Sequence, residues 1–176
     1  MLNAPQTFRL RQATEADAAT LGQVHVQAWH EAYAGIIPDA VLAALDPAKR
    51  VAMWRDALAR GSVVHLAEQH GALVGFGAGR PQSDASLPYS GEIAAIYVLR
   101  RAQRFGVGRA LMAAVARDLL AQGHTGATLW VLEANSPARR FYEALGGKVV
   151  ASREEERDGF RATGIAYGWP DLTVLT

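Results

Sequence analysis

The chain has 176 residues, half of them apolar, which is close to the commonest size of one domain and enough to bury a sizeable core. Its 18 Lys and Arg and 17 Asp and Glu are spread along the sequence, so we expect neither a nucleic-acid-binding patch nor an acidic tail. The lack of cysteine excludes disulfides, thiolate zinc sites and cysteine nucleophiles. The longest apolar runs, IAAIYVL and ALMAAVA, have seven residues each and the N-terminus has no signal-peptide core, so we expect a cytoplasmic protein without a membrane span.

The N-terminal third predicts one strand followed by helices. TFRLRQA alternates apolar and polar residues, as a strand does. Thr14, followed by acidic residues, is typical of a helix N-cap, and that helix should span about residues 15–33. Two shorter helices should follow Pro38 and Pro47, the second with Asp46 as its cap.

The middle of the chain predicts a hairpin, a central strand and a long helix. SVVHLAEQHGALVGFGAGR contains two apolar strands around a His-Gly turn, and GEIAAIYVLR has the mostly apolar character of a central strand. Apolar residues then recur every four positions from Val107 to Leu119, which predicts a helix to about Gln122 with one apolar face.

The C-terminal part predicts a strand, a helix and a closing hairpin. GATLWVLEA is the strand, Ser136 caps a helix to about Leu145, and KVVASREEE and TGIAYGW can pair with each other. One strand–helix–strand crossover is thus combined with antiparallel hairpins. We therefore expect a single α+β domain over residues 1–176, with a mixed, mostly antiparallel central sheet flanked by helices.

AQRFGVGRAL, residues 102–111, places two glycines one residue apart at the start of the long helix. Backbone N–H groups at a helix N-terminus lie at the positive end of its dipole, which suits a phosphate, whereas the alternative is a purely structural turn. A Rossmann fingerprint would need a third glycine at Leu111, and a Walker loop would need Ser or Thr at Val149. Both of these phosphate-binding motifs are therefore excluded.

Two motifs in the expected order resemble the GNAT superfamily of acyl-CoA-dependent N-acetyltransferases. Residues 103–108 fit its pyrophosphate signature, Gln/Arg-x-x-Gly-x-Gly/Ala. NSPARRFYEALGG, one strand later, fits Asn-x-x-Ala-x-x-Phe-Tyr-x-x-x-Gly. The resemblance is close over about residues 90–150 and looser at HVQAWHEAYAGIIP and AYGWPDL. The chain departs from the pattern at Arg100, where many members have Pro, at Phe105, where small residues are common, and at Gly147, where Phe is usual.

The resemblance implies that acetyl-CoA is the cosubstrate and fills a wedge between splayed fourth and fifth strands. The pantetheine arm would pair with the backbone of Tyr97, Val98 and Leu99. The pyrophosphate would be held next to Gln103 by the backbone of the following segment, which consists of Arg104, Phe105, Gly106, Val107, Gly108 and Arg109. Asn135, three residues before the motif residue Ala138, would bond a pantetheine amide; its alternative role is that of a loop or cap residue.

The resemblance also implies roles for an acid and a base. An alkylamine with a pKa near 10.4 costs roughly 4 to 5 kcal/mol to present neutral at pH 7, so a base or a desolvating pocket must help. Glu92 has the spacing of the general base in the histone-acetylating branch, and strand alternation would place it opposite Tyr97; a solvated strand-end carboxylate is the alternative. Tyr142 would protonate the leaving thiolate, unless it is only a core aromatic, and the Val98 N–H would polarise the acetyl carbonyl.

The acceptor side is less defined by sequence. Trp29 and Tyr33, one helical turn apart, would present an aromatic face, or else belong to the core, and Glu31 or Asp84 could bind a cationic amine. The five histidines have no metal-ligand spacing, so no metal is expected.

The resemblance therefore implies an N-acetyltransferase that acts on a small primary amine by direct attack in a ternary complex, without nucleic-acid or membrane partners. The alternatives are an enzyme for protein or peptide amines and a non-catalytic acyl-CoA sensor. A homodimer through the C-terminal strands is possible for this fold.

Overall fold

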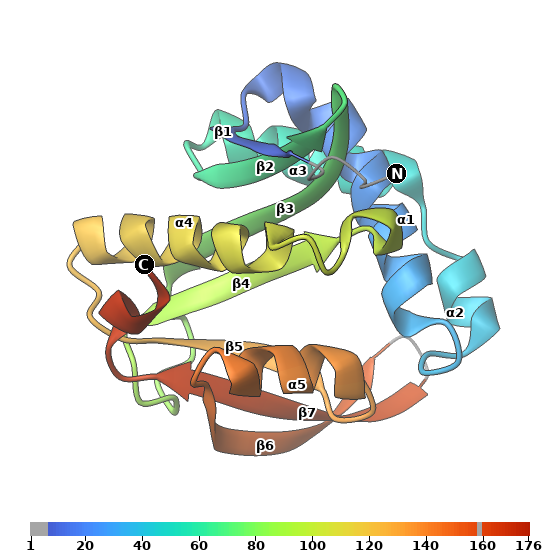
Figure 1. Ribbon diagram of the computed structural model, residues 1–176. Coiled ribbons are helices and arrows are strands. Elements are labelled where there is room, and N and C mark those ends of the chain that lie inside the picture. The colour runs from blue at the N-terminus through green and yellow to red at the C-terminus, as the bar shows by residue number, and fades with distance from the viewer. Residues whose placement is uncertain (1–6, 158–159) are drawn as a thin grey trace, which may run out of the picture.

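The computed structural model describes residues 7–157 and 160–176 and contains one seven-stranded sheet in the order β1-β2-β3-β4-β5-β7-β6 (Figure 1). The strands are β1 (Arg9–Gln12), β2 (Val64–Gln69), β3 (Ala72–Pro81), β4 (Gly91–Val98), β5 (Ala127–Leu132), β6 (Lys148–Arg157) and β7 (Phe160–Trp169). The α-helices are α1 (Ala18–Tyr33), α2 (Asp39–Ala43), α3 (Pro47–Ala59), α4 (Val107–Ala121) and α5 (Ser136–Ala144), and the 3-10 turns are η1 (Glu15–Asp17), η2 (Arg100–Ala102) and η3 (Leu172–Leu175). The strands pair antiparallel except for β4 and β5, which confirms the predicted α+β fold.

Local sequence signals explain most of these elements. Thr14 and Asp17 form a reciprocal capping box, so the predicted first helix is present, although its first turn is a 3-10 helix. Asp46 caps α3 by accepting the N–H of Ala48, with Pro47 directly after it. The His70-Gly71 turn joins β2 to β3 with both residues at positive φ, as the type I′ form of a two-residue hairpin turn requires.

The predicted cap of α5 is wrong by one residue. Asn135 is the N-cap, and its side-chain oxygen accepts the N–H of Ala138 at 3.3 Å, whereas Ser136 is the first residue of the helix. Pro137 in the first turn lacks the N–H that would otherwise need a partner. The short η3 turn after β7 was not predicted; Asp171 caps it by accepting the N–H of Thr173.

The two faces of the sheet are covered by different helices (Figure 1). α1 and α3 cover one face, where their apolar residues pack against Phe76, Ala78, Ala95 and Tyr97. α4 covers the other face of β3, where glycines alternate with those side chains. A Cβ at Gly79 would lie 2.8 Å from Val115 Cγ1, so the helix can pack this closely only because β3 carries no side chain there.

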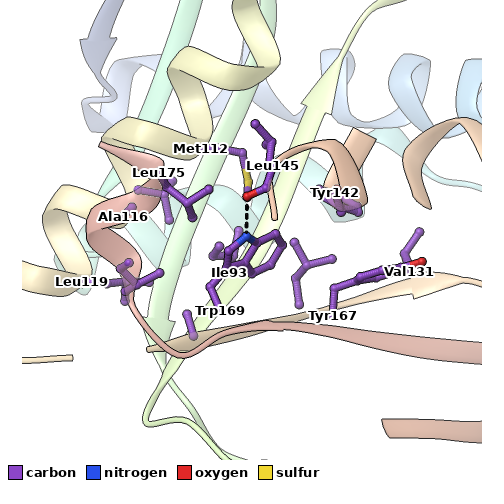
Figure 2. Packing of buried hydrophobic residues seen from close by; sticks show 14 of the residues in the cluster. Ile93, Met112, Ala116, Leu119, Val131, Tyr142, Leu145, Tyr167, Trp169 and Leu175 are labelled. Atoms are coloured by element: carbon purple, nitrogen blue, oxygen red, sulfur yellow. Dashed lines mark hydrogen bonds between the residues drawn. The ribbon is translucent and has the colours of Figure 1, made fainter. Parts of the chain in front are cut away.

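A second core lies beneath α4 and α5. It joins residues of β4, β5 and β7 to both helices and to η3 (Figure 2). Trp169 is its largest fully buried side chain, and its indole N–H donates to the carbonyl of Leu145 at 2.9 Å. This bond satisfies both a buried indole and a carbonyl at the end of α5, so the helix is fixed over β7.

An irregularity in the pairing of β3 with β4 changes which residues share a face. Ala78 pairs with Ala95 and Gly79 pairs with Ile93, so Ala94 is an extra residue on β4. Among the residues that the structure describes, no helix is long and apolar enough to cross a membrane.

Candidate active site

β4 and β5 diverge after a short parallel contact. Only Gly91 with Ala127 and Glu92 with Thr128 are paired, and beyond them the two strands separate, as the resemblance predicted. A cleft of about 650 Å³ opens there. It is lined by β4, β5, the last turns of α1, the segment before α4 and the start of α5. Backbone groups on the facing edges of these two strands therefore have no strand partner along the cleft.

The segment between β4 and α4 forms one end of this cleft. Gly106 is the N-cap of α4 at φ +84°, and a Cβ built on it would meet nothing within 4 Å. Gln103 donates its side-chain N–H to the carbonyl of Val98 at 2.9 Å, which holds the segment against β4. The predicted residues that line the cleft here are Gln103, Arg104, Gly106, Gly108 and Arg109. The first turn of a fifteen-residue helix thus points its N–H groups toward the cleft.

Two residues of the same segment lie elsewhere. The Phe105 side chain is 47% exposed, and Val107 is buried in the apolar cluster beneath α4. Neither side chain is among those that line the cleft. Their side chains therefore fix the segment or face solvent, and any contact with an anion would have to come from their backbone.

Gly108 is close to an aromatic ring. A Cβ at this position would lie 3.1 Å from Cζ of Phe141, which lines the cleft from α5. The absence of a side chain therefore lets the first turn of α4 and the middle of α5 approach each other at the cleft. The spacing of the two glycines predicted a special turn, but it gave no indication of this contact.

The edge of β4 that faces the cleft differs in two residues from the prediction. The Leu99 N–H donates to the carbonyl of Val74 at 2.8 Å, so it is used within the sheet, and Leu99 is fully buried. Because N–H groups alternate in direction along a strand, the N–H of Val98 points to the cleft side instead. By the same alternation, the backbone groups of Tyr97, which pairs with Phe76, also point to β3. The prediction that Leu99 and Tyr97 pair with a ligand through their backbones is therefore wrong; Val98 and Ile96 occupy the free edge.

Tyr142 lies where the second core meets the cleft. Its side chain is 8% exposed and its ring packs against Phe141, Tyr167 and Trp169 at centroid distances of 5.3, 6.1 and 6.2 Å. It also lines the cleft, so the core and the cleft roles of this residue are compatible. Burial raises the pKa of its phenol well above the usual value, and Tyr97 contributes less. The phenol therefore keeps its proton at neutral pH.

Glu92 does not lie where strand alternation predicted. It pairs in register with Arg80, while Tyr97 pairs with Phe76, and Arg80 and Phe76 are both on the α1 face of β3. Glu92 and Tyr97 therefore share a face, although five positions separate them, because the extra residue Ala94 shifts the alternation.

The carboxylate of Glu92 has a partner. Arg80 Nε and Nη2 donate to its two oxygens at 2.6 and 3.0 Å, and the Glu92 side chain is 12% exposed. Glu92 is not among the residues that line the cleft. The geometry therefore gives Glu92 a partner on the neighbouring strand β3 and no place in the lining of the cleft.

The acceptor-side aromatics are separated by the structure. Tyr33 lines the cleft, and its hydroxyl lies 3.0 Å from that of Tyr97 on β4. Trp29 does not line the cleft; it packs at 5.1 Å from Tyr33, and the Arg50 guanidinium lies 4.9 Å from its ring centroid. Trp29 therefore supports Tyr33 from behind, and its buried Nε1 has no hydrogen-bond partner in the described part of the chain.

The candidate acceptor carboxylates are both engaged. Glu31 lines the cleft and accepts the backbone N–H of Arg100 at 2.6 Å and the side-chain N–H of Gln27 at 2.9 Å. Asp84 accepts both donors of Ser86 in its own loop and lies 3.4 Å from Arg153.

Sequence reasoning missed several residues of the site. Trp130 of β5 lines the cleft, and the Arg153 guanidinium is 3.9 Å from its ring centroid. Arg100 and Arg140 also line the cleft. Strand alternation could have identified Trp130, because its neighbours Leu129 and Val131 are buried on the opposite face.

His25 is a second aromatic support behind Tyr97. Its Nδ1 accepts the indole N–H of Trp54 at 3.0 Å, and its ring lies 5.4 Å from that of Tyr97. Burial lowers the pKa of His25 to about 4, and nearby Arg50 acts in the same direction. The ring is therefore neutral at pH 7, and it can accept the Trp54 bond.

Comparisons with known proteins agree with this geometry. The acetyltransferase (GNAT) family profile matches residues 26–147. The uncharacterised N-acetyltransferase YuaI of Bacillus subtilis (strain 168) is 35% identical over 94% of this chain and 95% of its own. A second relative, called Rv2775 in Mycobacterium tuberculosis, is 30% identical over 79% of each chain.

Solved structures share the fold at lower identity. yncA of Salmonella typhimurium, solved with its cofactor acetyl-CoA, superimposes with a TM-score of 0.70 at 21% identity over 94% of each chain. The PaiA N-acetyltransferase of Thermoplasma acidophilum, solved with coenzyme A, has a TM-score of 0.67 at 19% identity over 90% of this chain and 98% of its own.

Proposed function

Because the chain belongs to the acetyltransferase (GNAT) family, whose members transfer acetyl from acetyl-CoA to amines, we propose that it acetylates a small primary amine by direct attack in a ternary complex. The observation that carries this proposal is the splay of β4 and β5. It brings a helix N-terminus and a buried phenol to one side of a cleft and an aromatic wall to the other.

The residues at the splay fit acetyl-CoA. The open space around Gly106 and the N–H groups of the first turn of α4 suit a pyrophosphate, with Arg104 and Arg109 beside them. We propose that the free edge of β4 at Ile96 and Val98 pairs with the acetylated pantetheine arm, with the Val98 N–H opposite its thioester end. The Asn135 oxygen caps α5, so its side-chain amide nitrogen is the group proposed to meet a pantetheine carbonyl, next to Ala138.

The thioester supplies an electrophilic carbonyl. Residues of the chain are proposed to stabilise the negative charge that develops on it and to donate a proton to the leaving thiolate. The Val98 N–H points to the cleft and is proposed to donate to the carbonyl oxygen as negative charge develops there. Tyr142 is proposed to donate its phenol proton to the departing thiolate. Burial keeps the phenol protonated until the thiolate forms, and the same apolar surroundings raise the basicity of that thiolate, so that it can take the proton.

A group other than Glu92 must accept the proton of the amine, because Glu92 does not line the cleft. In the described residues, Glu31 is the one carboxylate that lines the cleft, and both of its oxygens already accept hydrogen bonds. We propose that the amine loses its proton to water. The apolar and aromatic walls of the cleft reduce the cost by disfavouring the charged form.

Tyr33 and Tyr97 form one wall of the cleft, which we call the acceptor wall. The shape of the cleft at this wall favours a small molecule over a peptide as the acceptor. The hydroxyl contact between Tyr33 and Tyr97 connects α1 to β4 across this side of the cleft. Trp130 forms the opposing wall, with Arg153 over its ring. A peptide would need an open groove between these elements, whereas a compact amine would need only a pocket.

The test is release of free coenzyme A thiol with a panel of aminoglycosides, polyamines, amino-acid analogues and peptides. We expect turnover with at least one small amine, and Tyr142→Phe should reduce it. Turnover with peptides only would replace the proposal by a peptide acetyltransferase. Tight acetyl-CoA binding without turnover of any amine would indicate a sensor.

We also propose that the whole chain is one acetyltransferase domain. The same sheet contains β1 from the N-terminal part and β6 and β7 from the C-terminal part. Limited proteolysis should therefore release no stable fragment that ends between them.

A further inference from the structure

α1 and the segment that leads to α4 hold each other through two hydrogen bonds. The Glu31 carboxylate accepts the backbone N–H of Arg100 at 2.6 Å. In return, the Arg100 guanidinium donates to the backbone carbonyl of Glu31 at 2.9 Å. The two residues are 69 positions apart, and both line the cleft. We call this pair the Glu31–Arg100 clasp.

Each bond satisfies a backbone group that its own helix leaves without a partner. Arg100 is the first residue of η2, so its N–H has no acceptor within that turn. Glu31 is in the last turn of α1, where carbonyls have no N–H four residues ahead in the helix. A cation beside the C-terminus of a helix is also favoured by the helix dipole. The clasp is thus a reciprocal cap between two elements.

The clasp joins the two sides of the cleft. Glu31 is two residues before Tyr33, which forms the acceptor wall with Tyr97. Arg100 is three residues before Gln103, where the segment proposed to bind the pyrophosphate begins. The side-chain amide of Gln27 holds the second carboxylate oxygen of Glu31 at 2.9 Å, so the acceptor of the clasp is itself oriented.

Resting on the proposed function, we infer that the Glu31–Arg100 clasp is a positioning device that couples acetyl-CoA binding to the order of the acceptor wall. When the segment before α4 closes on the pyrophosphate, Arg100 and Glu31 restrain the last turn of α1, and Tyr33 is fixed for the amine. By linkage, an amine that orders this turn strengthens acetyl-CoA binding by the same factor.

Proline at position 100 is a specific variant for this inference. A proline has no N–H for Glu31 to accept. Leu99 has φ −59° and ψ 143°, which the residue before a proline adopts readily, and the first position of a helical turn tolerates proline. Arg100→Pro should therefore remove both bonds and leave the backbone path unchanged.

The experiment is amide hydrogen exchange with and without acetyl-CoA for the parent, Glu31→Ala, Arg100→Pro and a control, Asp56→Ala, on an exposed ion pair of α3. In the parent and the control, acetyl-CoA should slow exchange at residues 103–109 and, by about fivefold, at residues 28–34. In the two clasp variants only residues 103–109 should respond. Glu31→Gln keeps an oxygen for the Arg100 N–H and should restore part of the response.

The outcomes separate this inference from the function on which it rests. If residues 28–34 respond equally in the parent and in both clasp variants, or do not respond in the parent, the coupling is refuted. If residues 103–109 do not respond in any protein, the proposed cosubstrate site itself is wrong. Melting temperatures of the five proteins confirm that each is folded, and they do not decide the coupling.

Discussion

The two faces of the sheet at the splay are built in different ways. On the α4 and α5 face, glycines, backbone N–H groups and a helix N-terminus dominate, and Gly106 and Gly108 matter because side chains are absent there. On the α1 and α3 face, large rings from helices and strands pack on one another; the hydroxyls of Tyr33 and Tyr97 lie within hydrogen-bond distance, and the Trp54 indole donates to His25.

This difference explains why only one face has a recognisable sequence motif. Backbone recognition requires particular residues at fixed spacing, because only glycine permits the turn and the close approach. Recognition by side chains can be built from many combinations of rings and can change with the ligand. The first face therefore indicates the family, and the second is expected to determine the acceptor.

The largest expected effect tests the chemistry of the α5 side. Tyr142→Phe removes only the hydroxyl, so turnover should fall roughly 10- to 1,000-fold while the melting temperature stays within a few degrees of the parent. Because burial raises the pKa of Tyr142, the rate of the parent should not fall through loss of this proton below about pH 10. The pH profile of turnover for both proteins is the measurement. Retained turnover with a large loss of stability would make Tyr142 purely structural.

The α1 face should respond to pH through His25. Its pKa is about 4 in the fold and near 6.5 when unfolded, so the unfolded chain binds more protons between these values. Stability is therefore complete above pH 6.5 and is lost as the pH falls toward 4, by about 2 kcal/mol at pH 5. Urea unfolding at pH 8 and pH 5 measures this loss. His25→Asn should lower stability at both pH values but remove most of the difference between them; an unchanged difference would contradict the assignment.

Gly108 tests whether the opposite face depends on an absent side chain. Gly108→Val should raise the Kd for acetyl-CoA by at least ~10-fold, because a side chain would stand where the backbone is proposed to meet the pyrophosphate. It should also lower the melting temperature, since its Cβ would press on Phe141. Titration calorimetry and thermal unfolding separate these effects. In a Phe141→Leu background the loss of melting temperature should be relieved, whereas the rise in Kd should remain. An unchanged Kd for Gly108→Val would show that this turn does not bind the pyrophosphate.

The smallest effect is expected at Glu92. This residue shares a face of the sheet with Tyr97, but it lies at the end of β4 that is still paired with β5. Glu92→Gln should keep turnover within about threefold and cost about 0.5 to 1 kcal/mol through the weakened bond to Arg80. The pH dependence of kcat for both proteins is the measurement. A fall of about 100-fold, with recovery at high pH, would restore Glu92 as the general base.

The sequence predicted the elements well because their signals are local. The cap at Asp46, the turn at His70-Gly71 and the spacing of Gly106 and Gly108 depend on neighbouring residues alone. Apart from the one-residue error in the cap of α5 and the short η3 turn, the failures depend on contacts between distant segments. The position of Glu92 follows from one extra residue in the pairing of β3 with β4, and nothing in the run IAAI distinguishes Ala94 as that residue.

The site was only partly predictable for the same reason. The motif residues indicated the cofactor end, but the use of the Leu99 N–H within the sheet depends on where β3 lies. The separation of Trp29 from Tyr33 depends on how α3 packs, because Arg50 covers the indole. Spacing of one helical turn could not show which of the two rings reaches the cleft.

The short parallel contact between β4 and β5 also has a mechanical consequence. Two residue pairs join strands β1 to β4 with strands β5 to β7, while the neighbouring antiparallel ladders are longer. Tension applied between residues 7 and 176 would load this seam along with the contacts of α4 to β3 and to η3. The β4–β5 contact should break first and leave two parts of the sheet whose own strand ladders are intact. A molecule tethered at these two residues would report that rupture as a first, small step in extension.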